Sequence, residues 1–210
     1  MFTGLVTAVG RIASVTPLGT EPDHGKRVRL EVDAAWLRGV ELGESIAVSG
    51  ACMTVVALEP EAFAVDISAE SLARTTGLDT PGALVNLEQS VALSTKLGGH
   101  LVTGHVDGVG RVARFEPVGE SWLLAVDAPA SLGKFFAYKG SIVVNGVSLT
   151  VNRVDDLPGL CRVSINLIPH TLQHTNLHQL RVGSAVNLEI DLIARYVARM
   201  LGAAKEPSDV

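Results

Sequence analysis

Two short segments carry the side chains best suited to chemistry, "SGACMTV" (residues 49–55) and "NGVSLTV" (residues 145–151). Each predicts a strand with a glycine, a thiol or hydroxyl, and a threonine on one face: Gly50, Cys52 and Thr54 in the first, Gly146, Ser148 and Thr150 in the second. Such groups among apolar neighbours suit the hydrogen-bonding edge of a heteroaromatic ring, and the glycine would let a flat ligand approach the backbone. The alternative is a plain strand whose small buried residues are satisfied by backbone groups.

Thiol and imidazole groups add few further options. A thiolate nucleophile needs a nearby base or cation, and the sequence shows none beside Cys52, so we interpret Cys52 as pocket lining first and nucleophile second. His100 and His105 would lie on opposite faces of a continuous strand, and no further ligand joins them at metal-binding spacing. We therefore predict no metal site. Proton transfer at a pocket rim suits them better, with an ordinary surface or core role as the alternative.

The two segments belong to an internal repeat. "MFTGLVTAVGRIASV" (residues 1–15) and "LVTGHVDGVGRVARF" (residues 101–115) share seven identities in fifteen positions. Residues 44–58 and 140–154 share six in fifteen, and "VNLE" closes both copies. A period near 98 residues is right for a whole domain. The predicted units are two homologous domains and a tail, with bounds 1–96, 97–190 and 191–210.

Within each copy, β-branched runs separated by Gly and Pro predict about six strands, and closure into a barrel removes exposed edges from so short a sheet. The predicted fold is all-β: two tandem homologous six-stranded antiparallel Greek-key β-barrels plus a C-terminal α-helix. A short helix is predicted after "VDIS" and after "INLI", with Ala69 and Pro169 in the first turns. Helix capping and ligand binding are both open for Ser68.

The tail has no counterpart in the first copy. Its apolar residues recur at helical spacing and form one stripe: Ile193, Val197, Met200, Leu201 and Ala204. We interpret the stripe as a subunit contact, with docking onto a barrel as the alternative. Asp191 would cap this helix or face the pocket as an acceptor.

Composition narrows the class of protein. A net charge of −5 and a pI near 5.7 disfavour nucleic acid as a partner. No apolar run reaches the length of about 18 residues that suggests a membrane span, and no leader pattern opens the chain. Two widely spaced cysteines predict neither a disulfide scaffold nor a zinc site. We expect a soluble, cytoplasmic protein that binds neither nucleic acid nor membrane.

In several of its motifs the chain resembles the riboflavin synthase family (alpha chain). The motifs are "MFTGLV", "SGACMTV", "GGHLVTGHVDGVG", "KGSIVVNGVSLTVN", "LIPHTL" and "VNLEID", in the family's order from residue 1 to about residue 200. One departure is "SGACMT", where the family usually has Asn-Gly-x-Cys-Leu-Thr. Ser49 and Met53 change only the fine geometry of the first pocket.

The resemblance implies a cofactor-free transferase that completes riboflavin biosynthesis. Two molecules of 6,7-dimethyl-8-ribityllumazine react, and one donates a four-carbon unit to the other. The products are riboflavin and 5-amino-6-ribitylaminouracil. Two identical substrates need two similar pockets, which explains the repeat. The resemblance also implies a homotrimer, with the first barrel of one subunit facing the second barrel of a neighbour, and a possible association with lumazine synthase. The alternative is a non-catalytic lumazine- or flavin-binding accessory protein. A flavin-dependent reductase would need a βαβ unit that the chain lacks.

The resemblance also implies the site residues. Candidate catalytic residues are Phe2, Ser45, Cys52, His105, Ser148 and Asp191. Candidate substrate-binding residues are Thr3, Gly4, Val6, Cys52, Thr54, Asp66, Ser68, Ser71, Gly104, His105, Lys139, Gly146, Ser148, Thr150, Ile168, Pro169 and Thr171. His105 or Ser45 would move a proton, Cys52 would assist at C7 of the lumazine, and Lys139 and Asp191 would position polar groups. His105 is expected on the side of the second barrel.

Overall fold

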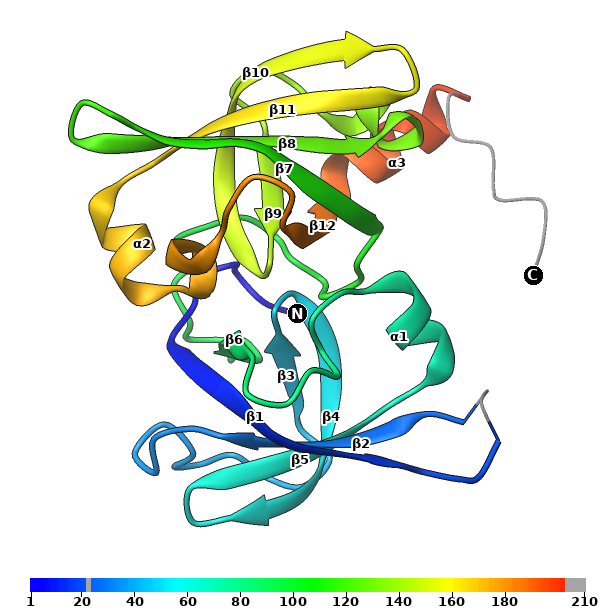
Figure 1. The fold of residues 1–210 in the computed structure, drawn as a ribbon, viewed down its shortest axis with the longest axis vertical. Coiled ribbons are helices and arrows are strands. Elements are labelled where there is room, and N and C mark those ends of the chain that lie inside the picture. Colours follow the sequence, from blue (N-terminus) through cyan, green and yellow to red (C-terminus); the bar gives the residue numbers. More distant parts are fainter. Residues whose placement is uncertain (22–23, 203–210) are drawn as a thin grey trace.

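The chain folds into two closed β-barrels of identical topology, stacked along the long axis of the molecule (Figure 1). The computed structural model describes residues 1–21 and 24–202. The strands of the first barrel pair in the order β1-β2-β5-β4-β3-β6. They are β1 (Ala8–Pro17), β2 (Lys26–Glu31), β3 (Ser45–Val48), β4 (Ala51–Glu59), β5 (Ala62–Ile67) and β6 (Leu84–Gln89).

The second barrel repeats this order as β7-β8-β11-β10-β9-β12. Its strands are β7 (Gly108–Val118), β8 (Ser121–Pro129), β9 (Ser141–Val144), β10 (Val147–Leu157), β11 (Leu160–Leu167) and β12 (Ala185–Ile190). All pairings are antiparallel, and the return of the fifth strand to the second makes each barrel a Greek key. The predicted fold class is confirmed.

Both barrels bend at matching places. The pairing register shifts between Ile12 and Ser14 in β1, and between Val112 and Arg114 in β7. The two shifts lie 100 residues apart, at equivalent positions of the repeat. Such bulges sharpen the curvature that a six-stranded sheet needs in order to close. The repeat in the sequence is therefore a repeat in backbone detail.

The two hairpins that carry the chemistry-bearing segments meet tip to tip. Ser49 and Gly50 have φ values of 44° and 87°, and Asn145 and Gly146 have 47° and 82°, as a two-residue type I′ turn requires. A Cβ on Gly50 would lie 2.8 Å from the amide nitrogen of Gly146, and the reverse contact is also 2.8 Å. Both positions need glycine for the turn and for this close approach.

Each barrel has its own apolar core, and a third, smaller cluster lies between them. The small cluster contains Phe2, Ala47, Val102 and Val143, with Cys52 packed against it. Phe2 and Val102 occupy equivalent positions of the repeat, and so do Ala47 and Val143. The junction between the barrels is thus built by equivalent residues from both copies.

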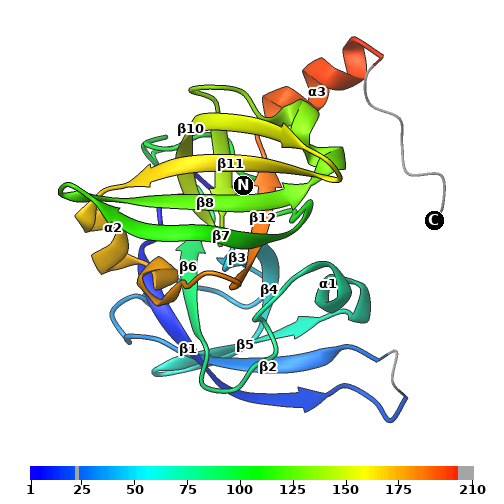
Figure 2. The same ribbon diagram turned by 45° about the horizontal axis from the view of Figure 1, so that its top comes forward.

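Within residues 1–21 and 24–202, three α-helices lie outside the barrel walls (Figures 1 and 2). α1 (Ala69–Arg74) and α2 (Pro169–His174) lie on opposite sides of the molecule near the junction, where the sequence predicted them. α3 (Leu192–Met200) contacts the second barrel at the 3₁₀ turn η1 (Ala130–Phe135). A further 3₁₀ turn, η2 (Asn176–Gln179), follows α2.

The predicted apolar stripe of α3 is exposed to solvent rather than docked on a barrel. The exposed fractions are Ile193 61%, Val197 47%, Met200 85% and Leu201 78%. Ala204 lies outside the described residues. The helix is held instead by the buried Ala198 and by an ion pair of 2.5 Å between Arg195 and Asp107. Within the part of the chain that is described, no helix has the length and apolarity to cross a membrane.

Candidate functional site

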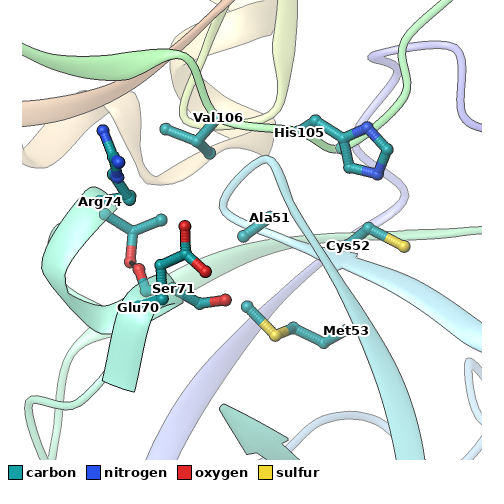
Figure 3. A pocket seen from close by; sticks show the side chains of 10 residues that line it. Ala51, Cys52, Met53, Glu70, Ser71, Arg74, His105 and Val106 are labelled. Carbon is teal, nitrogen blue, oxygen red and sulfur yellow. Dashed lines mark hydrogen bonds between the residues drawn. The ribbon is translucent and has the colours of Figure 1, made fainter. Parts of the chain in front are cut away.

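A pocket of about 260 Å³ opens in the first barrel between β4, α1 and the segment 104–106 (Figure 3). Its lining residues are Ala51, Cys52, Met53, Glu70, Ser71, Arg74, Thr75, Gly104, His105 and Val106. In Figure 3 the His105 imidazole and the Cys52 thiol lie at one end, and the α1 side chains Glu70, Ser71 and Arg74 at the other. The volume is slightly below the roughly 300 Å³ at which small-molecule pockets usually begin.

One wall of this pocket comes from the other repeat. The segment 104–106 leads into β7 of the second barrel, yet the amide of Cys52 donates to the carbonyl of Gly104 at 2.8 Å. A Cβ on Gly104 would lie 2.7 Å from that of Cys52, so only glycine fits here. Val106 packs against the core of the first barrel. The second repeat therefore completes the pocket of the first barrel.

The reciprocal contact exists on the second barrel. The amide of Ser148 donates to the carbonyl of Gly4 at 2.8 Å, and a Cβ on Gly4 would lie 2.6 Å from that of Ser148. Val6 packs against the core of the second barrel. The segments that open the two repeats, residues 2–6 and 102–106, are thus exchanged between the barrels. We call the surface around Gly4 and Ser148, which corresponds in the repeat to the first-barrel pocket, the second-barrel face.

His100 contacts the second-barrel face directly. Its Nδ1 lies 2.7 Å from Oγ of Ser148, within hydrogen-bond distance. A Cβ on the preceding Gly99 would lie 2.0 Å from the carbonyl oxygen of Thr3. Only glycine at position 99 therefore allows the two backbone segments to lie this close together. The segment "GGH" (residues 98–100), which connects the two barrels, therefore places an imidazole beside the hydroxyl of Ser148.

Burial controls the protonation of His100. It lowers the pKa of the imidazole, while the charge of Asp191 acts in the opposite, smaller sense. Nε2 of His100 is buried without a hydrogen-bond partner, which among the described side chains marks it as unusual. A neutral imidazole beside a hydroxyl can accept its proton. No group of three or more potential metal ligands occurs within residues 1–21 and 24–202.

A model of the lumazine binding domain matches the chain twice, over residues 3–90 and 103–191. The riboflavin synthase of Photobacterium phosphoreum is 38% identical over 202 residues, which cover 96% of this chain and 89% of that protein. That of Bacillus subtilis is 38% identical over 207 residues, covering 98% and 92%. The chain belongs to the riboflavin synthase family.

A structural neighbour supports the riboflavin synthase fold. LumP complexed with 6,7-dimethyl-8-(1'-D-ribityl) lumazine is 28% identical, with a TM-score of 0.76 over 90% of this chain and 98% of LumP. LumP complexed with riboflavin has a TM-score of 0.78 over 90% of this chain and 99% of that chain. The two barrels of this riboflavin synthase family member are therefore shared with a protein that binds both compounds.

The structure corrects the placement of His105. The resemblance places it on the side of the second barrel, but it lies in the first-barrel pocket with Cys52. Gly104 and Ser71 line the same pocket. The cause is the exchange of segments, because His105 belongs to the second repeat while packing on the first barrel.

Of the other expected residues, some lie on or against the first barrel and the rest on the second barrel or α2. Ser45 and Thr54 are paired on β3 and β4, and Phe2 is buried against the cluster that includes Cys52. Thr150 is exposed on β10, Lys139 contacts Asn152 at 3.2 Å, and Ile168 and Pro169 begin α2, where Thr171 is half-buried. Thr3 is buried and donates to Glu88.

Four expected residues have a structural partner instead of an open face. Gly146 is packed against Gly50 rather than offering its backbone to a ligand. Asp66 pairs with Arg27 at 2.7 Å, which lowers the pKa of the carboxyl. Ser68 caps α1 by accepting from the amide of Ser71, and Asp191 caps α3 by accepting from that of Ile193. Asp191 also lies close enough to influence His100.

Six of the lining residues were not predicted from the sequence, and two of them, Glu70 and Arg74, are charged. Both line the first-barrel pocket from α1. Their counterparts one repeat later are His170 and His174, whose rings stack at 4.0 Å on α2. The helical spacing of four residues was the available signal, since residues i and i+4 share a helix face.

Proposed function

We propose that this protein is a riboflavin synthase. It transfers a four-carbon unit between two molecules of 6,7-dimethyl-8-ribityllumazine and releases riboflavin and 5-amino-6-ribitylaminouracil. The observation that carries the proposal is the pair of equivalent barrels, in which each chemistry-bearing strand faces a segment exchanged from the other repeat. Two equal binding surfaces suit a reaction between two equal substrates. The relatives named riboflavin synthase support the same activity.

Each barrel holds one lumazine in this proposal: the barrel of the first domain (residues 1–96) together with segment 104–106, and the barrel of the second domain (97–190) together with the segment around Gly4. In the first-barrel pocket, Cys52 assists at C7 of the lumazine, and His105 at the same end of the pocket moves a proton. Small polar groups on the neighbouring strands, Ser45 and Thr54, hold the edge of the ring. Because both reactants are bound and aligned, orientation supplies much of the catalysis.

On the second-barrel face, Ser148 and His100 form the proton-transfer pair. The neutral imidazole accepts the hydroxyl proton, and the hydroxyl contacts the substrate. Thr150, Lys139, Ile168 and Thr171 bind the polar groups of the ring and the ribityl chain, and Asp191 tunes His100. The two barrels thus offer different chemistry, a thiol with an imidazole on one and a hydroxyl with an imidazole on the other.

The two lumazines meet across subunits. α1 and α2 lie on opposite sides of the molecule (Figures 1 and 2). α1 lines the first-barrel pocket, and α2 is its equivalent in the second repeat, so in this proposal the two binding surfaces of one chain do not face each other. A second copy must therefore bring its second-barrel face to the first-barrel pocket. The exposed apolar stripe of α3 supplies a contact for a homotrimer, since neighbouring exposed apolar side chains on one helix face are typical of an interface. We place the enzyme in the cytoplasm, with lumazine synthase as a possible partner.

The test is incubation of the purified protein with the lumazine alone. Formation of riboflavin without any added cofactor supports the proposal. A ligand that binds and fluoresces but is never consumed would show an accessory protein instead, comparable with LumP in its complexes.

A further inference from the structure

The motifs "FTG" and "VTG" near the start of each repeat wrap around a buried carboxylate. One oxygen of Glu88 accepts from the amide of Thr3 at 2.7 Å and from its hydroxyl at 2.6 Å. The other oxygen accepts from the amide of Gly4 at 2.9 Å. Gly4 has a φ of +74°, so the two successive amides form a concave anion-binding nest.

The second repeat builds the same arrangement. One oxygen of Glu189 accepts from the amide and the hydroxyl of Thr103, both at 2.7 Å, and the other from the amide of Gly104 at 3.0 Å. Gly104 has a φ of +79°. Glu189 and Glu88 are the last residues of the repeated "VNLE", so the sequence carries both halves of the nest twice.

Both carboxylates are deeply buried, with exposed fractions of 6% for Glu88 and 2% for Glu189. Burial raises the pKa of each carboxyl, while the hydrogen bonds from the nest act against this shift. A barrel core needs no buried acid at this place, since burying a charge costs stability unless it is fully paired. The retention of both acids points to a task other than packing.

The task follows from what each nest presents to the other barrel. Glu189 belongs to the second barrel, but the nest that it holds places the carbonyl of Gly104 on the amide of Cys52 in the first. Glu88 belongs to the first barrel, and its nest places the carbonyl of Gly4 on the amide of Ser148 in the second. Each acid is thus linked to the site on the opposite barrel.

We propose that Glu88 and Glu189 are crossed positioning residues: Glu189 sets the geometry of the first-barrel pocket, and Glu88 that of the second-barrel face. This inference rests on the proposed function for its catalytic meaning, but its geometry can be tested without substrate. Glutamine has the same shape as glutamate but only one accepting oxygen. In a Glu→Gln variant, the side-chain NH₂ group therefore faces a backbone N–H or hydroxyl donor of the nest, and that hydrogen bond is lost. The segment held by that nest then loosens.

The first test follows the reactivity of the Cys52 thiol. In a Cys161→Ala background, Glu189→Gln should raise the rate of alkylation of Cys52 by iodoacetamide by about tenfold, the scale of one charge-assisted hydrogen bond. Glu88→Gln is the matched control, because it removes an equivalent contact from the same kind of nest, and it should leave this rate unchanged. Equal rates in all three proteins would overturn the proposal.

The reciprocal test moves the thiol to the other barrel. With Ser148→Cys in a background of Cys52→Ser and Cys161→Ala, Glu88→Gln should raise the alkylation rate and Glu189→Gln should not. If the fold loosened in general, each Glu→Gln variant would raise the alkylation rates of the thiols at positions 52 and 148 equally. That pattern would also overturn the proposal.

Should Glu189→Gln not fold, Thr103→Val removes only the hydroxyl contact to Glu189 and keeps both amide contacts. This variant should raise the alkylation rate of Cys52 by a smaller factor and leave that of the thiol introduced at position 148 unchanged. An unchanged alkylation rate at Cys52 would overturn the proposal. Because labelling needs no lumazine, its outcome is independent of whether the protein makes riboflavin.

Discussion

Phe2 and Val102 pair with each other at the junction between the barrels, although one hundred residues separate them in the chain. The amide of Phe2 donates to the carbonyl of Val102 at 2.8 Å, and the amide of Val102 donates to that of Phe2 at 3.1 Å. Both side chains are 1% exposed. The two opening segments therefore cross at this bridge before each reaches the opposite barrel.

Truncation of this bridge should destabilise the whole protein. Phe2→Ala leaves a cavity between the barrels and is expected to lower the free energy of unfolding by about 3–5 kcal/mol, as for other buried phenylalanines. Urea denaturation followed by circular dichroism measures the change. Leu93→Ala, at a fully exposed position of the linker, should stay within about 0.5 kcal/mol of the parent. A Phe2→Ala loss as small as this would contradict the bridge as a structural element.

Replacing Cys52 by serine makes the first barrel chemically similar to the second, where Ser148 occupies the equivalent position. We expect Cys52→Ser to fold normally, to keep most of its affinity for the lumazine and to lose turnover by about 10²-fold, the lower end for one positioned group. Steady-state kinetics and equilibrium binding separate the two effects. Loss of binding with unchanged turnover of the bound fraction would show that the thiol only lines the pocket.

The pH dependence of activity should report His100. Because burial lowers the pKa of this imidazole below 6.5, it stays neutral, and able to accept a proton from Ser148, to lower pH than an ordinary histidine. The acid limb of kcat/KM should therefore lie below pH 6.5. His100→Asn should lower kcat/KM and remove that limb. A limb that is unchanged in the variant would assign it to another group.

The same shift has a consequence for stability. A histidine with a depressed pKa in the folded state binds fewer protons than in the unfolded chain between its folded pKa and 6.5. The contribution of His100 to the free energy of unfolding is thus fully present above pH 6.5, and it is lost as the pH falls through the pKa of His100 in the folded protein. Urea midpoints between pH 7 and pH 5 should fall more steeply for the parent than for His100→Asn, and parallel curves would contradict the burial argument.

The exposed stripe of α3 should hold the subunits together. Tyr196→Glu places a charge on that face, where the exposed fraction of Tyr196 is 62%, and should shift the mass in solution from trimer toward monomer with loss of activity. Analytical ultracentrifugation measures the shift. Leu42→Glu is the control, because Leu42 is similarly exposed at 65% on the first barrel. A fully active monomer would refute the arrangement across subunits.

Much of this architecture is predictable from the sequence. The repeated motifs predict two equal barrels, Ala69 and Pro169 mark the starts of α1 and α2, and the spacing of Ile193 and Val197 predicts α3. These features depend on local patterning, which the sequence carries directly. Alternation in a strand and the period of a helix identify the buried faces without knowledge of the partner.

The exchange of segments is not predictable in this way. His105 stands in the second repeat by sequence, and no local pattern tells on which barrel the segment before β7 will pack. The signal that was available lay in "VNLE". A polar Asn and an acidic Glu kept at equivalent positions of a buried strand in both repeats indicate buried partners, and the structure shows Asn86 and Asn187 bonded to the opposite barrel.

In the proposed arrangement, a first-barrel pocket and a second-barrel face from different subunits form one site. Ser71→Trp fills the former from α1, and Thr171→Trp fills the latter from the equivalent position of α2, so each variant alone should be inactive. Coexpression of the two chains should restore riboflavin formation, since mixed trimers contain sites with both halves intact. If the mixed protein assembles but stays as inactive as its parents, the two halves do not meet across subunits.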